Sequence, residues 1–172
     1  YIVTHVHFIL STEPTCNLSY ASLAKAFEGR DTLPTPEEIR QEVIRIRRAK
    51  LPDPEEIPNG GSFFMNPILT KEQAAKLPED APRFDATLPD GTPGVKTSAA
   101  WLIDHAGFHK GYKTSGNAAA GLSTMHTLAL TNRGGATAAD IAELAKTVQD
   151  GVERAFGIRL VPEPVVIGMS LK

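Results

Sequence analysis

A serine hydroxyl beside two glycines is the first feature of this 172-residue chain that could do chemistry. Ser62 lies in the segment GGSFFMNP at residues 60–67, whose glycines let the backbone approach a ligand closely. No histidine or acid stands beside Ser62, so nothing local would make it a nucleophile. A hydroxyl held in place can instead give its proton to a developing carbanion or enolate. The same residues also fit a plain turn in which the serine caps backbone groups.

Three further side chains could contact a substrate. Glu163 stands between two prolines that limit its backbone freedom, and a carboxyl aimed in this way can assist proton transfer or orient a substrate carbon by its charge. Asn66 offers an amide donor and acceptor just before a proline, and His126 precedes an expected strand. Two of the three have an ordinary alternative: Glu163 as a surface acid, and His126 as a half-buried histidine.

Basic side chains precede the serine segment. Residues 35–38 (TPEE) predict the start of a helix, with a hydroxyl cap, proline at the first position and acids in the first turn. Ile39, Val43 and Ile46 follow at helical spacing and should bury one face. The end of this helix carries four cations that suit the negative end of its dipole: Arg45, Arg47, Arg48 and Lys50. Because they lie near Ser62 in the sequence, some of them are also candidates for holding phosphate.

No metal site is expected. His5 and His7 share one face of an expected strand, but no third ligand stands at a suitable spacing. His105 and His109 are four residues apart, but Gly107 interrupts the helix that a metal pair would need.

The elements that must position these groups follow from periodicity and from helix start and stop signals. Strands are expected at residues 2–10, 127–132, 158–160 and 165–167, and a surface loop at 78–94. Helices are expected at residues 71–77, 98–106 (with Trp101 and Leu102 inward, and the side of His105 left open) and 138–156, with a short helix or turn in 17–27. The helix over 138–156 has the strongest signals, because Thr137 and Asp140 can cap its start and Gly157 can end it. This order predicts an α+β fold, with helices packed on a small, mostly antiparallel sheet.

Composition excludes several classes of protein. Hydrophobic residues make up 41% and charged residues 22%, which is ordinary for a globular domain, and the net charge of -2 gives no support for a nucleic-acid binder. No apolar run approaches the length of a membrane span. The single cysteine excludes an internal disulfide and fits a reducing, cytoplasmic compartment.

Five segments in order resemble motifs of one known family. They are KLPDP at 50–54, GSFFMNP at 61–67, AWLID at 100–104, NRGGATA at 132–138 and PEPVVIG at 162–168. Together they resemble the UDP-N-acetylenolpyruvoylglucosamine reductases, the MurB family. The resemblance covers nearly the whole chain but matches only the C-terminal half of such an enzyme. It implies that residues 31–172 form the substrate-binding α+β domain. Residues 1–30 would be the tail end of the preceding FAD-binding region or a connecting strand.

The resemblance also implies a reaction. In this family NADPH reduces bound FAD, and the flavin passes a hydride to the enolpyruvyl double bond to give UDP-N-acetylmuramate for peptidoglycan. Ser62 matches the serine that protonates the substrate, and Glu163 matches the catalytic glutamate. Lys50 and His126 match positions that contact the substrate. We therefore expect Ser62 and Glu163 to line one open cleft, with Lys50, Asn66 and His126 on its wall. Arg47 matches an arginine near the flavin.

The resemblance implies that the FAD-binding portion lies before Tyr1, and the chain itself has no Gly-x-Gly-x-x-Gly loop after a strand and no P-loop. This chain alone should therefore neither hold FAD tightly nor turn over. The rival interpretation is a non-catalytic α+β module that binds a nucleotide sugar or a protein. If Ser62 and Glu163 converge in the fold, the enzyme is favoured; if they lie on opposite faces, the module is favoured. The sequence does not predict the oligomeric state.

Overall fold

The computed structural model describes residues 2–13 and 15–171. The chain divides into two compact units, Tyr1–Lys50 and Leu51–Lys172. The boundary between these units does not test the predicted domain boundary after residue 30, which stays a prediction. Tyr1 and Pro14, which fall within that predicted first region, lie outside the described residues. No helix among the described residues is long and apolar enough to cross a membrane.

The N-terminal unit contains the helices α1 (Ala21–Ala26) and α2 (Pro36–Lys50). The predicted start of α2 is confirmed: Glu38 N donates to Thr35 Oγ1 at 3.2 Å, and Thr35 N donates to the Glu38 carboxylate at 2.7 Å. The pKa of Glu38 lies below its ordinary value. The largest cause is the hydrogen bond from the Thr35 backbone, and the next is the hydrogen bond from the Arg30 side chain. The prediction that α2 buries one face is wrong, because no residue of α2 is buried and Val43 is 37% exposed.

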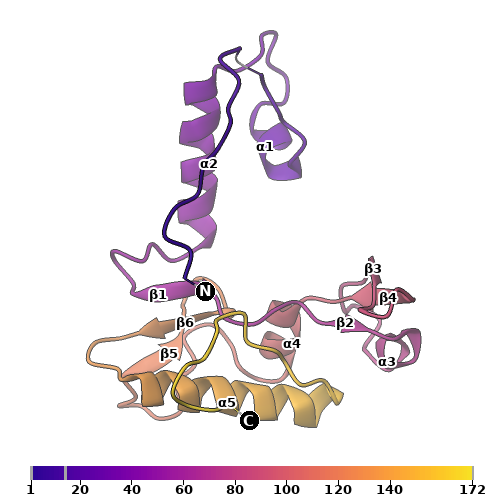
Figure 1. Ribbon diagram of the computed structural model, residues 1–172, viewed down its shortest axis with the longest axis vertical. Coiled ribbons are helices and arrows are strands. Elements are labelled where there is room, and N and C mark those ends of the chain that lie inside the picture. The colour runs from indigo at the N-terminus through magenta and orange to yellow at the C-terminus, as the bar shows by residue number, and fades with distance from the viewer. Residues whose placement is uncertain (1, 14, 172) are drawn as a thin grey trace. The chain divides into compact units, whose positions relative to one another are not determined.

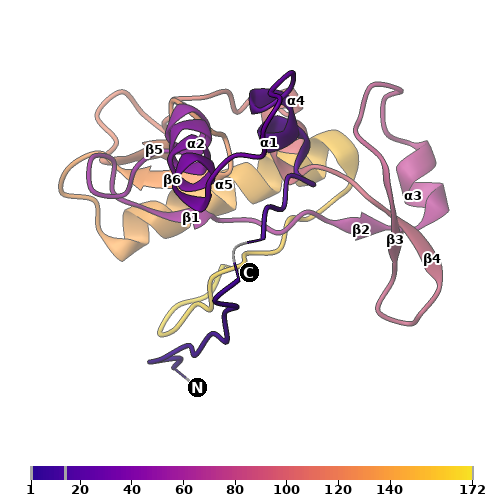
Figure 2. The same ribbon diagram turned by 90° about the horizontal axis from the view of Figure 1, so that it is seen from above.

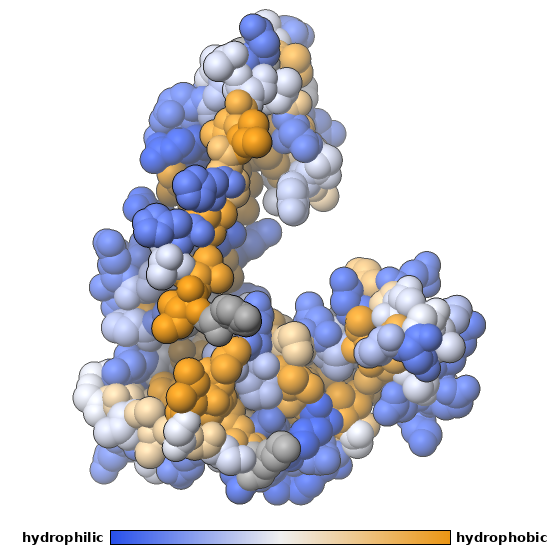
Figure 3. Space-filling model, in the orientation of Figure 1, coloured by the Kyte–Doolittle hydropathy of each residue, from blue (hydrophilic) through white to orange (hydrophobic). Residues whose placement is uncertain are grey.

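The predicted strand at residues 2–10 is wrong. These residues have no regular secondary structure, and their apolar side chains reach the surface of this unit (Figure 3), with Ile2 90% and Phe8 77% exposed. An alternating pattern makes a segment suitable for a sheet, but a strand also needs neighbouring backbone to pair with its N–H and C=O groups. The described part of the chain offers residues 2–10 no such pairing.

The C-terminal unit contains two three-stranded antiparallel sheets, which confirms the α+β class but divides the single expected sheet in two. The first has the order β1-β6-β5, formed by β1 (Asn59–Ser62), β6 (Ala129–Asn132) and β5 (Ala120–Leu122). The second has the order β2-β4-β3, formed by β2 (Ile68–Leu69), β4 (Pro93–Lys96) and β3 (Phe84–Thr87). The helices are α3 (Lys71–Ala75), α4 (Ala99–His105) and α5 (Ala138–Phe156). α5 runs beside β5 and β6 (Figure 1), whereas α3 accompanies the second sheet (Figure 2).

The loop expected at residues 78–94 instead contains most of a hairpin made of β3 and β4. Its turn is built on Asp90 and Gly91: the Asp90 carboxylate accepts from Thr92 N at 3.0 Å, and Gly91 has a φ of 86°. An Asp-Gly pair is a strong hairpin signal. The neighbouring prolines and polar residues obscured it, because they suit a loop equally well.

α5 has the bounds that the sequence predicts. Thr137 and Asp140 form a capping box at its start, and Gly157 ends it in the left-handed conformation with a φ of 67°. Four residues on its inner face are at most 1% exposed: Leu144, Ala145, Val148 and Val152. They belong to one core with Phe64, Leu102, Leu122 and Leu160, so α5 fixes both the first sheet and the chain after it.

A glycine within α5 makes room for an aromatic ring, and we expect Gly151→Ala to destabilise the protein. A Cβ at Gly151 would lie 2.2 Å from two ring carbons of Phe108. Alanine would gain about 1 kcal/mol in helix propensity, but overpacking costs about 1–3 kcal/mol and more for so close a contact. Urea unfolding should show a loss of about 1–2 kcal/mol. In a Phe108→Leu background the loss should disappear; if alanine stabilises the original protein, the close packing is not real.

Candidate active site

The candidate site is built around the backbone of Phe63. Phe63 N donates to Leu128 O at 2.8 Å on one side, and Phe63 O accepts from Glu163 N at 2.8 Å on the other. The pairing extends through Ser62 opposite Ala129 and through a bridge between Phe64 and Pro162. Paired segments of extended chain lie about 4.8 Å apart. Ser62 and Glu163, which are distant in the sequence, are therefore neighbours in the backbone arrangement.

Two features present Ser62 at the end of β1. The register of β1 against β6 shifts between Asn59 and Ser62, which marks an irregularity of the β-bulge type. Gly61 has a φ of 80°, which a residue with a side chain rarely adopts, and its N–H donates to Asn59 Oδ1 at 2.8 Å. Asn59 also donates to Ile57 O at 2.7 Å, so its amide holds both sides of the turn. The turn leaves Ser62 exposed to solvent.

The segment that carries Glu163 differs from the prediction. Neither 158–160 nor 165–167 forms a strand; the pairing lies between them, where Met65 N donates to Val161 O at 2.9 Å. Proline has no N–H, so Pro162 and Pro164 keep this segment from continuing as a regular strand. Glu163 supplies the N–H between the two prolines, and its side chain is exposed.

Asn66 connects the serine segment to α4. Its Oδ1 accepts from Ala99 N at 2.9 Å, in the first turn of a helix that Ser98 caps. The bond uses the oxygen of the amide and leaves the Nδ2 hydrogens to other partners. The structure thus gives Asn66 a role in packing, and its predicted contact with substrate stays a prediction.

His126 lies on a hollow between α4 and the turn before β6. Its Nδ1 accepts from Leu128 N at 3.1 Å, so the neutral ring carries its proton on Nε2. Burial and, to a smaller extent, the positive charge of Lys110 lower the pKa of His126. Both residues line an open hollow of about 320 Å³ together with Ala100, Trp101, Asp104, His105, Met125 and Thr127. The hollow offers a neutral N–H donor and a cation, but Ser62 and Glu163 are not among its lining residues.

Of the side chains considered for the inner face of α4, Leu102 is buried and Trp101 half-buried, whereas His105 does not point inward. His105 is exposed, its ring stacks on that of Trp101 with centroids 3.8 Å apart, and its Nδ1 lies 2.9 Å from Trp101 O. The larger indole is the half-buried partner and covers one face of the imidazole, so the histidine stays at the surface.

Lys50 and Arg47 belong to the N-terminal unit. Both are exposed in the last turn of α2, where they suit the helix dipole. Their predicted contacts with substrate and flavin stay predictions.

The glycine-rich turn before α5 does not fit the diphosphate of a flavin. The backbone N–H groups of Gly134 and Ala136 already donate to Asn132 Oδ1, at 2.9 and 3.0 Å. The Asp140 carboxylate accepts from Thr137 N at 2.7 Å, which places a negative charge where a phosphate would bind. Glu56 and Arg133 line the adjoining hollow of about 460 Å³, and the Arg133 guanidinium already donates to Leu122 O at 2.6 Å and to Thr131 Oγ1 at 2.9 Å. No group of three or more His, Cys, Asp or Glu side chains that could hold a metal ion occurs within residues 2–13 and 15–171.

Sequence reasoning missed what holds the site together. The bulge at Asn59, the two-sided pairing of Phe63 and the place of Lys110 beside His126 were not predicted. The Asn-Gly pair at residues 59 and 60 was a readable turn signal. The pairing of Phe63 depends on the tertiary fold and has no local signal.

Comparisons with known proteins agree on one family. Residues 53–167 match the family model described as UDP-N-acetylenolpyruvoylglucosamine reductase, C-terminal domain. A Thermobifida fusca protein named UDP-N-acetylenolpyruvoylglucosamine reductase is 44% identical over 187 residues, which cover 99% of this chain and 51% of that protein. Proteins of the same name from Streptomyces coelicolor and Xylella fastidiosa are 46% and 41% identical, covering 99% and 98% of this chain and 47% of each relative. The chain thus spans about half the length of the curated relatives it matches.

Proposed function

The chain belongs to the UDP-N-acetylenolpyruvoylglucosamine reductase family, and we propose that it acts as the substrate-binding and proton-donating half of such an enzyme. The complete enzyme would reduce the enolpyruvyl group of UDP-N-acetylenolpyruvoylglucosamine and form UDP-N-acetylmuramate for peptidoglycan, in the cytoplasm. Bound FAD, reduced by NADPH, would supply the hydride. The glycine-rich turn before α5 does not fit the diphosphate of FAD, so its binding is assigned to the part of the relatives that these 172 residues do not match.

The observation that carries this proposal is the hydrogen bond between Glu163 N and Phe63 O, which brings the backbones of Glu163 and Ser62 together. Addition of hydride to one carbon of the enolpyruvyl double bond leaves negative charge at the other carbon. Transfer of the Ser62 hydroxyl proton to that carbon completes the reduction, and exposed Ser62 recovers a proton from solvent. Such a donor depends on its placement more than on a low pKa, so it needs no neighbouring base.

The remaining predicted site residues are assigned to binding. Nδ2 of Asn66 and the Nε2–H of His126 are donors suited to the oxygen atoms of a nucleotide sugar. Lys50 is assigned to the diphosphate, where a cation makes charge-assisted hydrogen bonds. Arg47 is assigned to the neighbourhood of the flavin. Glu163 is assigned to the reacting carbon, where its charge orients the substrate or assists proton transfer.

Purified alone, the 172-residue chain should be colourless and should not oxidise NADPH, because the glycine-rich turn before α5 does not fit a flavin diphosphate. It should still bind the substrate weakly. Addition of UDP-N-acetylenolpyruvoylglucosamine should shift the amide NMR signals of Ser62, Asn66 and Glu163. UDP-N-acetylglucosamine, which lacks the enolpyruvyl group, should leave the Ser62 and Glu163 signals nearly unmoved.

Two results would contradict the proposal. A stoichiometric flavin absorbance band in the purified chain would show that the assignment of FAD to the other half is wrong. Shifts confined to residues away from Ser62 and Glu163 would make the domain a non-catalytic binding module.

A further inference from the structure

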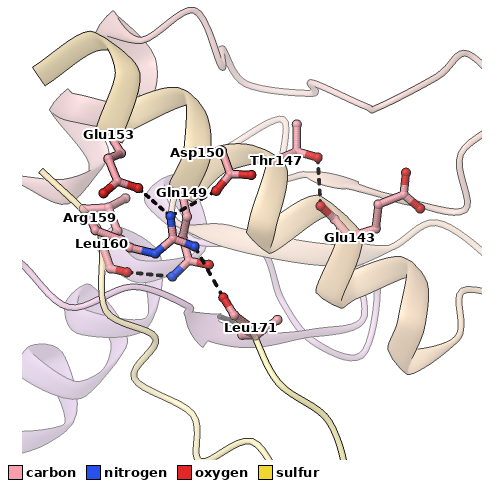
Figure 4. Close-up of polar contacts among 8 residues, drawn as sticks. All are labelled: Glu143, Thr147, Gln149, Asp150, Glu153, Arg159, Leu160 and Leu171. Carbon is pink, nitrogen blue, oxygen red and sulfur yellow. Dashed lines mark hydrogen bonds and ion pairs between the residues drawn. The ribbon is translucent and has the colours of Figure 1, made fainter. Parts of the chain in front are cut away.

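One polar side chain is buried on the inner, apolar face of α5. Gln149 is 3% exposed, and its neighbours Ala145, Val148 and Val152 are fully buried. Burying an amide is unfavourable unless its polar atoms are paired. Gln149 Nε2 donates to the carbonyl oxygen of Leu160 at 2.7 Å (Figure 4), whereas Oε1 has no hydrogen-bond partner in the described part of the chain. The one hydrogen bond described for this amide thus holds the Leu160 carbonyl.

Leu160 directly precedes the segment that carries Glu163. Two backbone hydrogen bonds join this segment to the serine segment: Met65 N to Val161 O at 2.9 Å and Glu163 N to Phe63 O at 2.8 Å. The flanking prolines, Pro162 and Pro164, have no N–H to add. A pairing of two hydrogen bonds opens easily unless the neighbouring chain is held in place. The hydrogen bond from Gln149 holds Leu160, at the start of the paired segment.

Arg159 makes a second connection between this segment and α5. Its guanidinium donates to Asp150 at 3.0 Å, also reaches Glu153, and has a longer contact of 3.5 Å with Leu171 O (Figure 4). The side chain of Arg159 is 36% exposed, and ion pairs at the surface contribute little because water screens them. The Gln149 bond is shielded from water and is the stronger of the two anchors.

We propose that Gln149 is a positioning residue, which holds the Leu160 carbonyl so that residues 161–163 stay paired with residues 63–65 and Glu163 stays beside Ser62. Its effect on the segment is a property of the fold, and its effect on catalysis rests on the proposed function. Misplacing a reacting group by about 1 Å can slow a reaction on the order of 100-fold, so an anchor remote from the substrate can still matter.

Amide hydrogen exchange in this chain tests the positioning directly. Gln149→Met keeps the length of the side chain and removes its donor. The amides of Glu163 and Met65 should then exchange roughly 10-fold faster, the change in an opening equilibrium when a buried hydrogen bond is lost. The amide of Phe63, which bonds to Leu128 on the other side, should not change. Thr147→Val is the matched control, because it removes a hydrogen bond to Glu143 O within α5 (Figure 4) and should leave both rates unchanged. Unchanged exchange at Glu163 and Met65 in Gln149→Met overturns the proposal.

Gln149→Glu keeps the proposal testable if the methionine variant does not fold. A protonated carboxyl can donate to the Leu160 carbonyl, whereas a carboxylate cannot. The ratio of the Glu163 exchange rate in this variant to that in the original protein should be near one at low pH and rise as pH rises. A ratio that does not depend on pH contradicts the proposal.

Catalysis provides a second readout in a full-length reductase, in which this chain follows the N-terminal half of a relative such as the Thermobifida fusca protein. Gln149→Met should slow reoxidation of the flavin by the enolpyruvyl substrate about 10-fold and leave flavin reduction by NADPH unchanged. In a Glu163→Gln background, Gln149→Met should slow reoxidation little further, because Gln149 acts through Glu163. If the rate losses of the two single variants multiply in full in the double variant, Gln149 does not act through Glu163. If the exchange rates change as expected but both Glu163→Gln and Ser62→Ala reoxidise normally, the proposed function fails while the positioning role stands.

Discussion

Glu163→Gln in the full-length reductase slows reduction of the enolpyruvyl group by roughly 100-fold or more, the range for a placed acid or base. Glutamine keeps the shape of the side chain and loses its charge and its ability to transfer a proton. The backbone bond from residue 163 to Phe63 O involves the main chain alone, so the variant should keep the segment in place. Turnover at saturating substrate measures the loss.

The matched control for this variant is Glu143→Gln. Glu143 is an exposed acid on α5, and its backbone oxygen accepts from Thr147 whatever its side chain is. This control should turn over normally, and the urea unfolding midpoints of both variants should stay close to that of the original protein. Normal turnover in Glu163→Gln would remove the carboxylate from the reaction.

Ser62→Ala should lower turnover at least on the order of 100-fold, the low end for a placed proton donor. Alanine removes the hydroxyl and leaves the glycine turn and the pairing with Ala129, which are backbone features. No other hydroxyl replaces it in the pairing around Phe63, so protonation of the reacting carbon must wait for solvent. Steady-state turnover with NADPH and the enolpyruvyl substrate measures the effect.

Ser115→Ala serves as the control for the serine variant, because Ser115 is an exposed serine in the loop between α4 and β5. Its turnover should match that of the original protein. Substrate affinity should change little in Ser62→Ala if the hydroxyl acts mainly in the transition state, so a large rise in KM with unchanged kcat would assign Ser62 to binding.

Local signals in the sequence predicted the helices well. The bounds of α5 were correct because Thr137, Asp140 and Gly157 act on their own neighbours, through a capping box and a left-handed end. The helix start at Thr35 was predicted for the same reason. The strands were harder, because residues 2–10 have a suitable pattern but no partner, and residues 161–163 have a partner but a proline-rich pattern.

Residue types together with the family resemblance singled out the candidate site residues, whose chemistry stays a proposal, but the contacts that assemble the site were not predicted. Ser62 and Glu163 were singled out, whereas their proximity depends on Phe63, which carries no chemical signal of its own. Gln149 was passed over because a polar residue within a helix is usually exposed, and only the packing of α5 places it against the Leu160 carbonyl. Distances along the sequence say nothing of such pairings.

Stopped-flow measurement of the two half-reactions in full-length Ser62→Ala tests most directly whether this chain supplies the proton to the substrate. Flavin reduction by NADPH needs no proton donor at the enolpyruvyl carbon and should proceed close to normally. Reoxidation of the reduced flavin by the enolpyruvyl substrate should slow by at least about 100-fold, because the added hydride leaves charge that must be quenched. Normal reoxidation, or equal slowing of both half-reactions, would contradict this account of Ser62.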